Sequence, residues 1–446
     1  MKIALISARI DPFISPVDMN GGCVLVRNYI KSLHRLGHDI HVFTRLDTEN
    51  ESNTERQNTK AKLQKEAGVG KVEVNNRLTI YRLPYNPMNE NSKTWKFQVE
   101  ESASFLKNTQ KYIEKENFDI FHYFHLLSLA GWSNLCGRIP FLEKSTFSPL
   151  LISAGRKFEY LEDDRIAFEK EVIESMPIIS CQSSGELEAI VREYGIDRAR
   201  LIQVPLGVDT TIFYPKSDFQ VTEQSDKRIL ISPNTLKRQK KQLEVVDIVA
   251  YLKSRGHRLV TIFIGRIREQ EYFEQIVNKI KHLNMSIKVI DAIPTRASLL
   301  SVEENFVYIP GKKEKELAEL IRSSDISVFP STDEGFGLLN LDCMACGTLP
   351  ICTKLSAYKD YLVNGENAIA IDVESTWQDF ALELDSLLPD TERLIKLSKI
   401  AANSAQNFSW DNLIKKQLFV YNQLYDNAKI ITTNYKGINW INLNDQ

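Results

Sequence analysis

Short apolar runs alternate with segments of helical period along most of the chain, and this alternation constrains the fold more than any other feature. The runs have the length of buried strands, and the segments between them place apolar residues on one helical face. Such alternation is typical of parallel sheets crossed by helices. Because 446 residues are too many for one ordinary core, we predict an α/β protein with two doubly wound sheets.

The expected strands form two groups. Those in the N-terminal half are Ile3–Ser7, Ile40–Thr44, Thr79–Leu83, Asp119–Phe124, Ile178–Cys181 and Leu201–Val204. Those in the C-terminal half are Arg228–Ser232, Val260–Ile264, Ile287–Ile290, Phe306–Ile309, Ile326–Pro330, Leu349–Cys352 and Ala368–Ile371. Amphipathic helices are expected at Val24–Leu36, Leu243–Leu252 and Trp410–Asn427.

Both periodicities disappear in residues 206–227, which we take as the boundary between the domains. The predicted domains are residues 1–210 and residues 225–405. Residues 50–74 are polar and charged and lack an apolar stripe, so we expect an exposed excursion there.

Composition excludes several classes of protein. The formal net charge of −2 lacks the basic excess of a nucleic-acid binder, so no nucleic-acid partner is expected. Six scattered cysteines do not form a secreted disulfide framework, and they favour a cytoplasmic location. The opening MKIALISARID is interpreted as a buried strand rather than a signal peptide. No uninterrupted apolar run approaches about 20 residues, so membrane contact would be peripheral, at the inner membrane face.

The most informative segment follows a predicted strand and opens a predicted helix, and it reads PSTDEGFGLLNLDCMACG, residues 330–347. A glycine turn at a helix N-terminus presents free amides and a positive dipole end, which together bind phosphate. Gly335 and Gly337 allow close backbone approach, and Glu334 can accept hydrogen bonds from sugar hydroxyls. Asp342, eight positions after Glu334, can chelate paired ribose hydroxyls. On spacing alone, a capped helix with a solvated aspartate fits equally well.

This segment resembles the signature of the family 4 retaining glycosyltransferases of GT-B fold, in which two acidic residues are separated by seven. The resemblance continues through Gly347–Pro350 and Val363–Asn367, the opening ISARIDPFISPVDMNGGCVLVRNYIKSLHRLGHDIHVFTR, the link IQVPLGVDTTIFYP and the last helix, FSWDNLIKKQLFVYNQLY. The opening is most similar to the sucrose-phosphate-synthase-like branch. The resemblance implies two Rossmann-like domains facing across a cleft, with the helix at residues 409–428 crossing back onto the first.

The resemblance also implies which residues hold the donor, a nucleoside diphosphate sugar that serves as co-substrate without a cofactor or a metal. Gly21 and Gly22 would form a donor-facing loop, which two adjacent glycines before a helix favour. The turn residues Gly335, Phe336, Gly337 and Leu338 would hold the diphosphate through backbone amides, Glu334 would orient the sugar, and Asp342 would hold the ribose.

In the family, an arginine and a lysine after the first strand of the second domain neutralise the diphosphate. Here Pro233 occupies the arginine position, and the stretch that follows is NTLKRQKK, residues 234–241. The candidate cations are Lys237, Arg238, Lys240 and Lys241. A solvated surface run of charge is the alternative interpretation.

The first domain carries a further departure, because the family's histidine near the reacting sugar is absent. Ser145 and Thr146 are the acceptor-side candidates at that place. His122 and His125 end the preceding strand and are the other catalytic candidates, as cleft-lining groups or as packed, hydrogen-bonded histidines. Cys343 and Cys346 form CxxC, but no second pair or nearby histidine completes a metal set, so close helix packing is the preferred interpretation.

What the resemblance implies is transfer with retention of configuration by a front-face displacement, from a donor that is a UDP-sugar by preference. The acceptor is open between a carbohydrate, a lipid-linked, a small-molecule and a protein acceptor. Three departures from the family motivate one alternative, a non-catalytic GT-B subunit that binds a partner glycosyltransferase or a glycan. They are the missing histidine, Pro233, and Asp342 where the family usually has glutamate. A nicotinamide-dependent dehydrogenase is excluded because Ser7–Asp18 contains no glycine.

Overall fold

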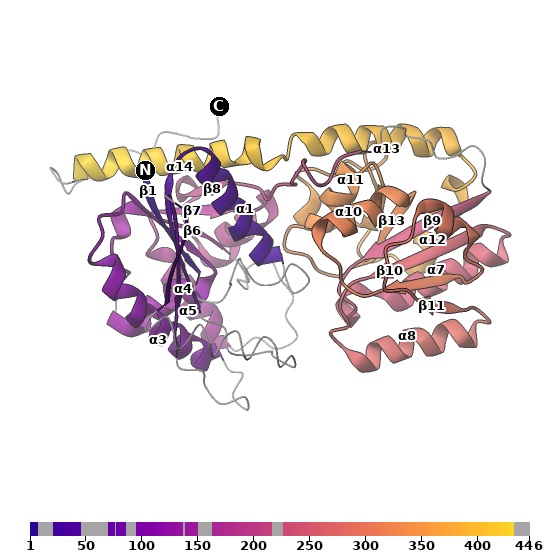
Figure 1. The fold of residues 1–446 in the computed structure, drawn as a ribbon, viewed down its shortest axis with the longest axis horizontal. Helices are drawn as coiled ribbons and strands as arrows, with labels where there is room; N and C mark the ends of the chain where they lie inside the picture. The colour runs from indigo at the N-terminus through magenta and orange to yellow at the C-terminus, as the bar shows by residue number, and fades with distance from the viewer. Residues whose placement is uncertain are drawn as a thin grey trace. The chain divides into compact units, whose positions relative to one another are not determined.

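The structure is a computed structural model that describes residues 1–7, 21–45, 70–75, 77–85, 95–136, 139–149, 163–215 and 226–431. Contacts divide the chain into two compact units (Figure 1). Unit 1 contains the described residues up to Pro205 together with those from Leu413 onward. Unit 2 contains Leu206–Asn412. The segment after Pro205 therefore packs with unit 2, where Val208 bridges Ser409.

Unit 1 is built on an eight-stranded sheet in the order β3-β4-β2-β1-β5-β6-β7-β8. All neighbours are parallel except β3, which pairs antiparallel with β4. The strands are β1 (Lys2–Ser7), β2 (Asp39–Arg45), β3 (Gly70–Asn75), β4 (Leu78–Leu83), β5 (Ile120–Phe124), β6 (Ser145–Ser148), β7 (Ile178–Cys181) and β8 (Leu201–Gln203). The main helices are α1 (Gly21–Arg35), α3 (Trp95–Ile113), α4 (Leu126–Cys136), α5 (Asp163–Glu174), α6 (Ser184–Ala189) and α14 (Trp410–Ile431), the last of which begins in unit 2.

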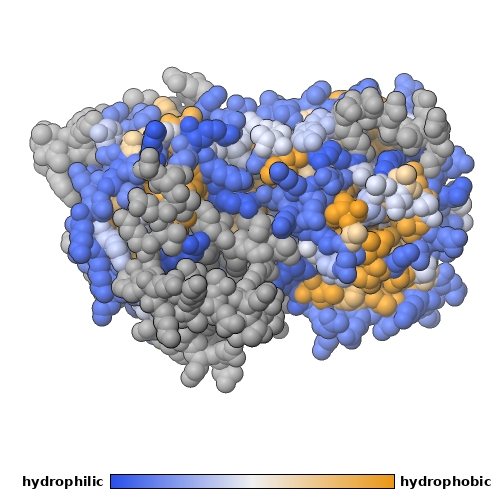
Figure 2. Space-filling model, viewed as in Figure 1, coloured by the Kyte–Doolittle hydropathy of each residue, from blue (hydrophilic) through white to orange (hydrophobic). Residues whose placement is uncertain are grey.

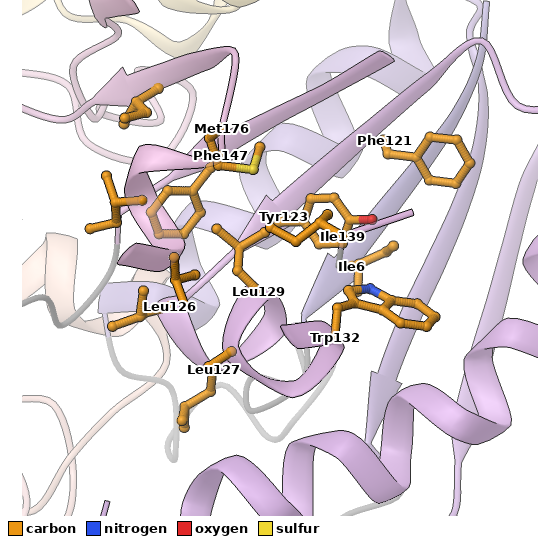
Figure 3. Close-up of a cluster of buried hydrophobic side chains, with 14 of the residues drawn as sticks. Ile6, Phe121, Tyr123, Leu126, Leu127, Leu129, Trp132, Ile139, Phe147 and Met176 are labelled. Carbon is orange, nitrogen blue, oxygen red and sulfur yellow. The ribbon is translucent and has the colours of Figure 1, made fainter. Parts of the chain in front are cut away.

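The core of unit 1 lies between this sheet and its helices. Figure 3 shows Tyr123 of β5 and Phe147 of β6 close to Leu126 and Leu129 of α4. These side chains are fully buried. Burial of strands on both faces explains why β1 and β5 are mainly apolar rather than alternating between apolar and polar residues.

Unit 2 is built on a seven-stranded, fully parallel sheet in the order β11-β12-β10-β9-β13-β14-β15. The strands are β9 (Lys227–Pro233), β10 (Arg258–Ile264), β11 (Ile287–Val289), β12 (Phe306–Ile309), β13 (Ile326–Phe329), β14 (Leu349–Thr353) and β15 (Ile369–Ile371). The helices are α7 (Gln242–Ser254), α8 (Gln270–His282), α9 (Arg296–Ser301), α10 (Glu314–Ser323), α11 (Leu338–Ala345), α12 (Trp377–Leu387) and α13 (Thr391–Gln406). The prediction of two Rossmann-like α/β domains is confirmed.

Every predicted strand is present, but two strands were not predicted. The strand β3 lies within the predicted exposed excursion, so that prediction is wrong for residues 70–74, while residues 50–69 lie outside the described part of the chain. The strand β6, STFS, carries three hydroxyl side chains and has no apolar alternation, although all four residues are buried. Leu36 ends the helix predicted over Val24–Leu36, but it lies beyond α1 and is 51% exposed.

Figure 2 shows hydrophilic residues over much of the drawn surface, with a hydrophobic area over unit 2. Among the described helices, none is both long enough and apolar enough to cross a membrane. The edge strand β11 ends the sheet of unit 2 with Val289 exposed.

Candidate functional site

The strand order of unit 2 reverses at β9. The chain runs outward from β9 through β10 and β12 on one side and through β13, β14 and β15 on the other. Ligands of open α/β sheets bind outside the carboxyl ends of the strands at such a reversal. Two loops leave the sheet there, residues 234–241 after β9 and residues 330–337 after β13. They are the two segments of unit 2 that the resemblance assigned to the donor.

Gly337 shapes the second of these loops. It is the N-cap residue of α11, and its backbone is left-handed with φ 79°. A Cβ atom on Gly337 would lie 2.3 Å from Cε1 of Tyr358. Only glycine therefore fits this position, for both its backbone angle and its space. In the first turn of α11, the Asn340 amide donates to the Gly337 carbonyl at 2.9 Å, whereas the amides of Leu338 and Leu339 precede any acceptor within the helix and can hold an anion.

Two tyrosines, Tyr358 and Tyr361, pack against the turn at Phe336 and Gly337. The Tyr361 hydroxyl donates to the carbonyl oxygens of Phe336 (3.0 Å) and Gly337 (3.1 Å). Phe336 is buried with its ring 5.2 Å from that of Tyr361. The predicted donor contact of Phe336 is therefore restricted to its backbone. Neither Tyr358 nor Tyr361 was singled out from the sequence, because they lie more than 20 residues away and no local signal marks them.

Lys241 determines how the basic loop presents its cations. A short 3₁₀ turn over Arg238–Lys240 ends at Lys241, which is left-handed with φ 53° and leads directly into α7. A non-glycine residue in this conformation is uncommon and reverses the direction of the chain. As a result, Lys240 is buried while Lys241 turns to form an ion pair with Glu244 at 2.9 Å.

Lys240 pairs directly with Glu334. The Lys240 Nζ donates to Glu334 Oε1, and only 10% and 16% of the two side chains are exposed. Burial lowers the pKa of Lys237, and the nearby Lys240 charge lowers it further, while the carboxylates of Glu334, Asp333 and Glu269 raise it. Lys237 therefore interacts electrostatically with both Lys240 and Glu334. The structure thus brings the predicted sugar-orienting carboxylate and one predicted phosphate cation into contact.

Arg238 has different partners. Its Nε lies 3.6 Å from Glu269 Oε2, an NH1 donates to Gln275 at 3.2 Å, and its guanidinium lies over the Tyr272 ring. Its side chain is 57% exposed. Within the basic loop, Arg238 and Lys241 are therefore occupied by carboxylates other than Glu334, and Lys240 is the best-placed cation.

Gln239 joins the two loops and was not predicted. Its Nε2 donates to the carbonyl oxygen (3.3 Å) and to Oδ2 (3.0 Å) of Asp333, and its own carbonyl accepts from the Thr332 amide (3.2 Å). These bonds fix the register of the Lys240–Glu334 contact. The sequence offers two weak signals for this contact: Gln239 is a polar residue between cations, and Asp333 is an acidic residue next to Glu334.

Asp342 lies in the second turn of α11 and is half-buried. Desolvation raises its pKa well above the usual range, and the carboxylates of Glu314 and Asp209 add to the effect. A carboxyl group in this setting gains from a partner that donates hydrogen bonds. Paired ribose hydroxyls are such a partner, as the predicted role requires.

Unit 1 has its own reversal of strand order between β1 and β5. Gly21 and Gly22 do not form a loop but are the first residues of α1. The residues that precede them lie outside the described part of the chain.

His122 lies inside the core of unit 1. Its Nδ1 is 2.6 Å from the Tyr421 hydroxyl and its Nε2 is 2.8 Å from Ser148 Oγ. The ring is fully buried, and desolvation lowers its pKa to about 3. The interpretation of His122 as a cleft-lining catalytic group is therefore wrong, and the packed, hydrogen-bonded alternative describes it.

His125 follows β5 directly, at the carboxyl edge of the sheet. It is left-handed, with φ 71°, and its Nδ1 accepts a hydrogen bond from the Leu127 amide at 3.1 Å. It therefore caps the start of α4, and only 3% of its surface is exposed. This geometry describes a capping residue.

Ser145 and Thr146 were expected on the acceptor side, but they begin β6 rather than end it. Ser145 donates to the Phe141 carbonyl at 2.7 Å, and Thr146 contacts the Ile178 carbonyl and Ser180. Both are fully buried. The acceptor-side assignment is wrong, because sites in such sheets form at the opposite, carboxyl ends of the strands.

The five cysteines whose side chains are described are buried: Cys23, Cys181, Cys343, Cys346 and Cys352. Across the described ranges, no group of three or more His, Cys, Asp or Glu side chains is arranged to hold a metal ion. The Cys343–Cys346 pair lies within α11 and at its end, packed in the interior of unit 2.

Known proteins resemble the chain along nearly its whole length. The family described as Glycosyltransferase Family 4 matches residues 19–212, and the family described as Glycosyl transferases group 1 matches residues 291–405. A D-inositol 3-phosphate glycosyltransferase of Corynebacterium aurimucosum is 23% identical over 422 residues, with 92% of this chain and 93% of the relative covered.

Two solved structures share the fold. Sucrose-phosphate synthase from Thermosynechococcus elongatus has a TM-score of 0.74 at 19% identity, covering 96% of this chain and 99% of the other. Anabaena Alr3699/HepE, solved with UDP and glucose, has a TM-score of 0.64 at 13% identity, covering 97% and 100%. With two family matches in chain order and this shared architecture, the chain belongs to the family 4 glycosyltransferases of GT-B fold.

Proposed function

We propose that this glycosyltransferase transfers a sugar from a nucleoside diphosphate sugar, with a UDP-sugar preferred, and with retention of anomeric configuration. The contact between Lys240 and Glu334 carries the proposal. It places a cation for the diphosphate and a carboxylate for the sugar side by side, at the point of unit 2 where open α/β sheets bind ligands.

The charges of the site suit a leaving diphosphate. Lys240 and Lys237 supply positive charge from the loop after β9, and the amides at the start of α11 supply a helix N-terminus. Preorganised groups of this kind stabilise the charge that develops as the sugar leaves. We propose that they do so without a metal ion, since these groups already act on the charge that a divalent cation would neutralise.

The proposed roles divide the donor into three parts. Glu334 accepts hydrogen bonds from the sugar, Lys240 and the amides of Gly337 and Leu338 hold the diphosphate, and Asp342 holds the ribose. For retention we propose a front-face displacement, in which the departing diphosphate takes the proton of the attacking acceptor hydroxyl. Lys240 would lower the free energy of that step by stabilising the phosphate charge.

Support for uridine comes from similarity. Anabaena HepE has the same fold and has been solved with UDP-glucose and with UDP. By their names, the matched D-inositol 3-phosphate glycosyltransferase transfers a sugar, and sucrose-phosphate synthase forms a sugar phosphate. HepE has been solved with glucose and with UDP-glucose, and on this similarity we propose a hexose as the transferred group.

A panel of nucleotide sugars with uridine, guanosine and adenosine bases tests the proposal in a thermal-shift assay followed by calorimetry. A specific donor raises the unfolding temperature by mass action, and a UDP-sugar should give the largest shift. The anomeric configuration of the product is then read by NMR. No shift with any nucleotide sugar would contradict donor binding, and inverted product would contradict retention.

A further inference from the structure

In the proposed donor site of unit 2, the candidate phosphate-binding cation forms an ion pair with the candidate sugar-binding carboxylate. Lys240 and Glu334 come from different loops, 94 residues apart, yet they form an ion pair with little exposure to water. The Gln239–Asp333 hydrogen bonds hold the two loops in that register. The cation best placed for a diphosphate is thus already neutralised by a carboxylate from the same site.

A diphosphate that takes Lys240 must therefore displace Glu334. The displaced carboxylate stays beside the incoming phosphates, because its turn is fixed by the Tyr361 hydrogen bonds and by Gly337. A half-buried carboxylate without a partner next to added negative charge is unfavourable, since charges separated from water repel strongly. Free nucleoside diphosphate offers Glu334 no compensating donor.

A nucleoside diphosphate sugar does offer one. Its sugar hydroxyls donate hydrogen bonds, which a carboxylate accepts at roughly twice the strength of a neutral acceptor. The intact donor can thus replace both halves of the ion pair at once, Lys240 with phosphate and Glu334 with sugar.

Resting on the proposed function, we propose that the Lys240–Glu334 ion pair is a specificity device that selects intact nucleotide sugar over free nucleoside diphosphate. The two side chains separate at low free-energy cost only for a ligand that carries both an anion for Lys240 and hydroxyl donors for Glu334. Its consequence for turnover is weaker inhibition by the nucleotide product.

The test is the affinity of three probes, inorganic pyrophosphate, UDP and UDP-glucose, measured by calorimetry on the whole chain and on Glu334→Gln. Removing the carboxylate charge frees Lys240, so pyrophosphate and UDP should bind about fivefold to tenfold more tightly. UDP-glucose should bind no more tightly than before. The ratio of UDP-glucose to UDP affinity should therefore fall in the variant.

Asp333→Asn is the matched control. It removes the negative charge of a carboxylate in the same turn, one that acts on Lys237, while the asparagine oxygen can still accept from Gln239 and hold the two loops in register. A gain for pyrophosphate equal to that of Glu334→Gln would show general charge repulsion and overturn the proposal. In a Lys240→Met background, Glu334→Gln should add little; an undiminished gain there would also overturn it.

Pyrophosphate separates the two proposals, because it has neither base nor sugar. Wild-type protein that binds no UDP or UDP-glucose contradicts the proposed donor, and a pyrophosphate gain in Glu334→Gln still supports the ion-pair device. Unchanged pyrophosphate affinity in a folded Glu334→Gln protein overturns the device whether or not UDP-glucose binds.

Discussion

The two units reverse their strand order in the same way but use the polar residues at the reversal differently. In unit 2 the loops after β9 and β13 bring Lys240 and Glu334 together at the carboxyl edge of the sheet. In unit 1 the polar groups of β5 and β6 turn inward, so that His122 bonds to Ser148 and to Tyr421 of α14. Polar residues near the same edge thus form the proposed donor site in one unit and pack into the core in the other.

This difference shows that position in an α/β sheet does not by itself identify a functional residue. His122 and Glu334 both lie on elements at a strand reversal, but their burial differs. His122 is fully buried with both ring nitrogens hydrogen-bonded, whereas 16% of the Glu334 side chain is exposed. A group that is enclosed and satisfied within the protein supports the fold. The comparison yields four predictions, ordered by the size of the expected effect.

The largest effect is expected from Gly337→Ala, which adds a methyl group in a left-handed position against Tyr358. The free energy of unfolding should fall by about 2 to 4 kcal/mol, from backbone strain and from the clash. Gly365→Ala is the control, because Gly365 has φ 78° but no atom within 4 Å of an added Cβ. Chemical denaturation should show a clearly smaller loss for Gly365→Ala. Equal losses would mean that Tyr358 yields and does not shape the turn.

The next effect concerns three cations of the basic loop, Lys240, Arg238 and Lys241. Lys240→Ala should slow transfer by about tenfold to a hundredfold and weaken UDP binding, because a charge-assisted contact to the leaving diphosphate is lost. Arg238→Ala and Lys241→Ala should change turnover by less than about threefold, since their side chains pair with Glu269 and Glu244. Steady-state kinetics on the three variants decides this. If Lys240→Ala resembles the other two, the phosphate is held elsewhere.

The third prediction addresses His122 in unit 1. With a folded-state pKa of about 3 against an unfolded value near 6.5, the ring must stay neutral in the fold, so stability is lost as the pH falls below about 6.5. At pH 5 this one group costs about 2 kcal/mol relative to pH 7. His122→Gln cannot titrate, so its unfolding free energy should fall by that much less between pH 7 and pH 5. Identical pH dependence in both proteins would show that His122 is not buried in its neutral form.

The smallest effect is expected for Asp342→Asn. Because the folded-state pKa of Asp342 is raised, the protonated carboxyl group favours the folded state. This contribution to stability is fully present below the unfolded-state pKa and is lost as the pH rises through the folded-state pKa. The variant should therefore be slightly more stable than wild type at pH 8, with the gain vanishing toward pH 4, and it should bind UDP more weakly. Such a gain of stability with a loss of affinity marks a functional residue. Lower stability at every pH would instead assign Asp342 a structural role.

The sequence predicted most of the fold because buried parallel strands leave apolar runs of strand length between helices. The strand β6 escaped because its hydroxyl groups are satisfied by the carbonyls of Phe141 and Ile178, which no local pattern reveals. For the site, the turn at Glu334 and Gly337 was predictable from its glycines. The choice of Lys240 among four cations was not, because it depends on the left-handed backbone of Lys241.

Hydrogen exchange with and without saturating UDP tests the central claim most directly, that the diphosphate binds at the strand reversal of unit 2. The account predicts slower exchange of backbone amides in residues 234–241 and 330–342, with no change in residues 120–136 around His122 and His125. Protection of residues 120–136 without protection of the two unit 2 segments would contradict it.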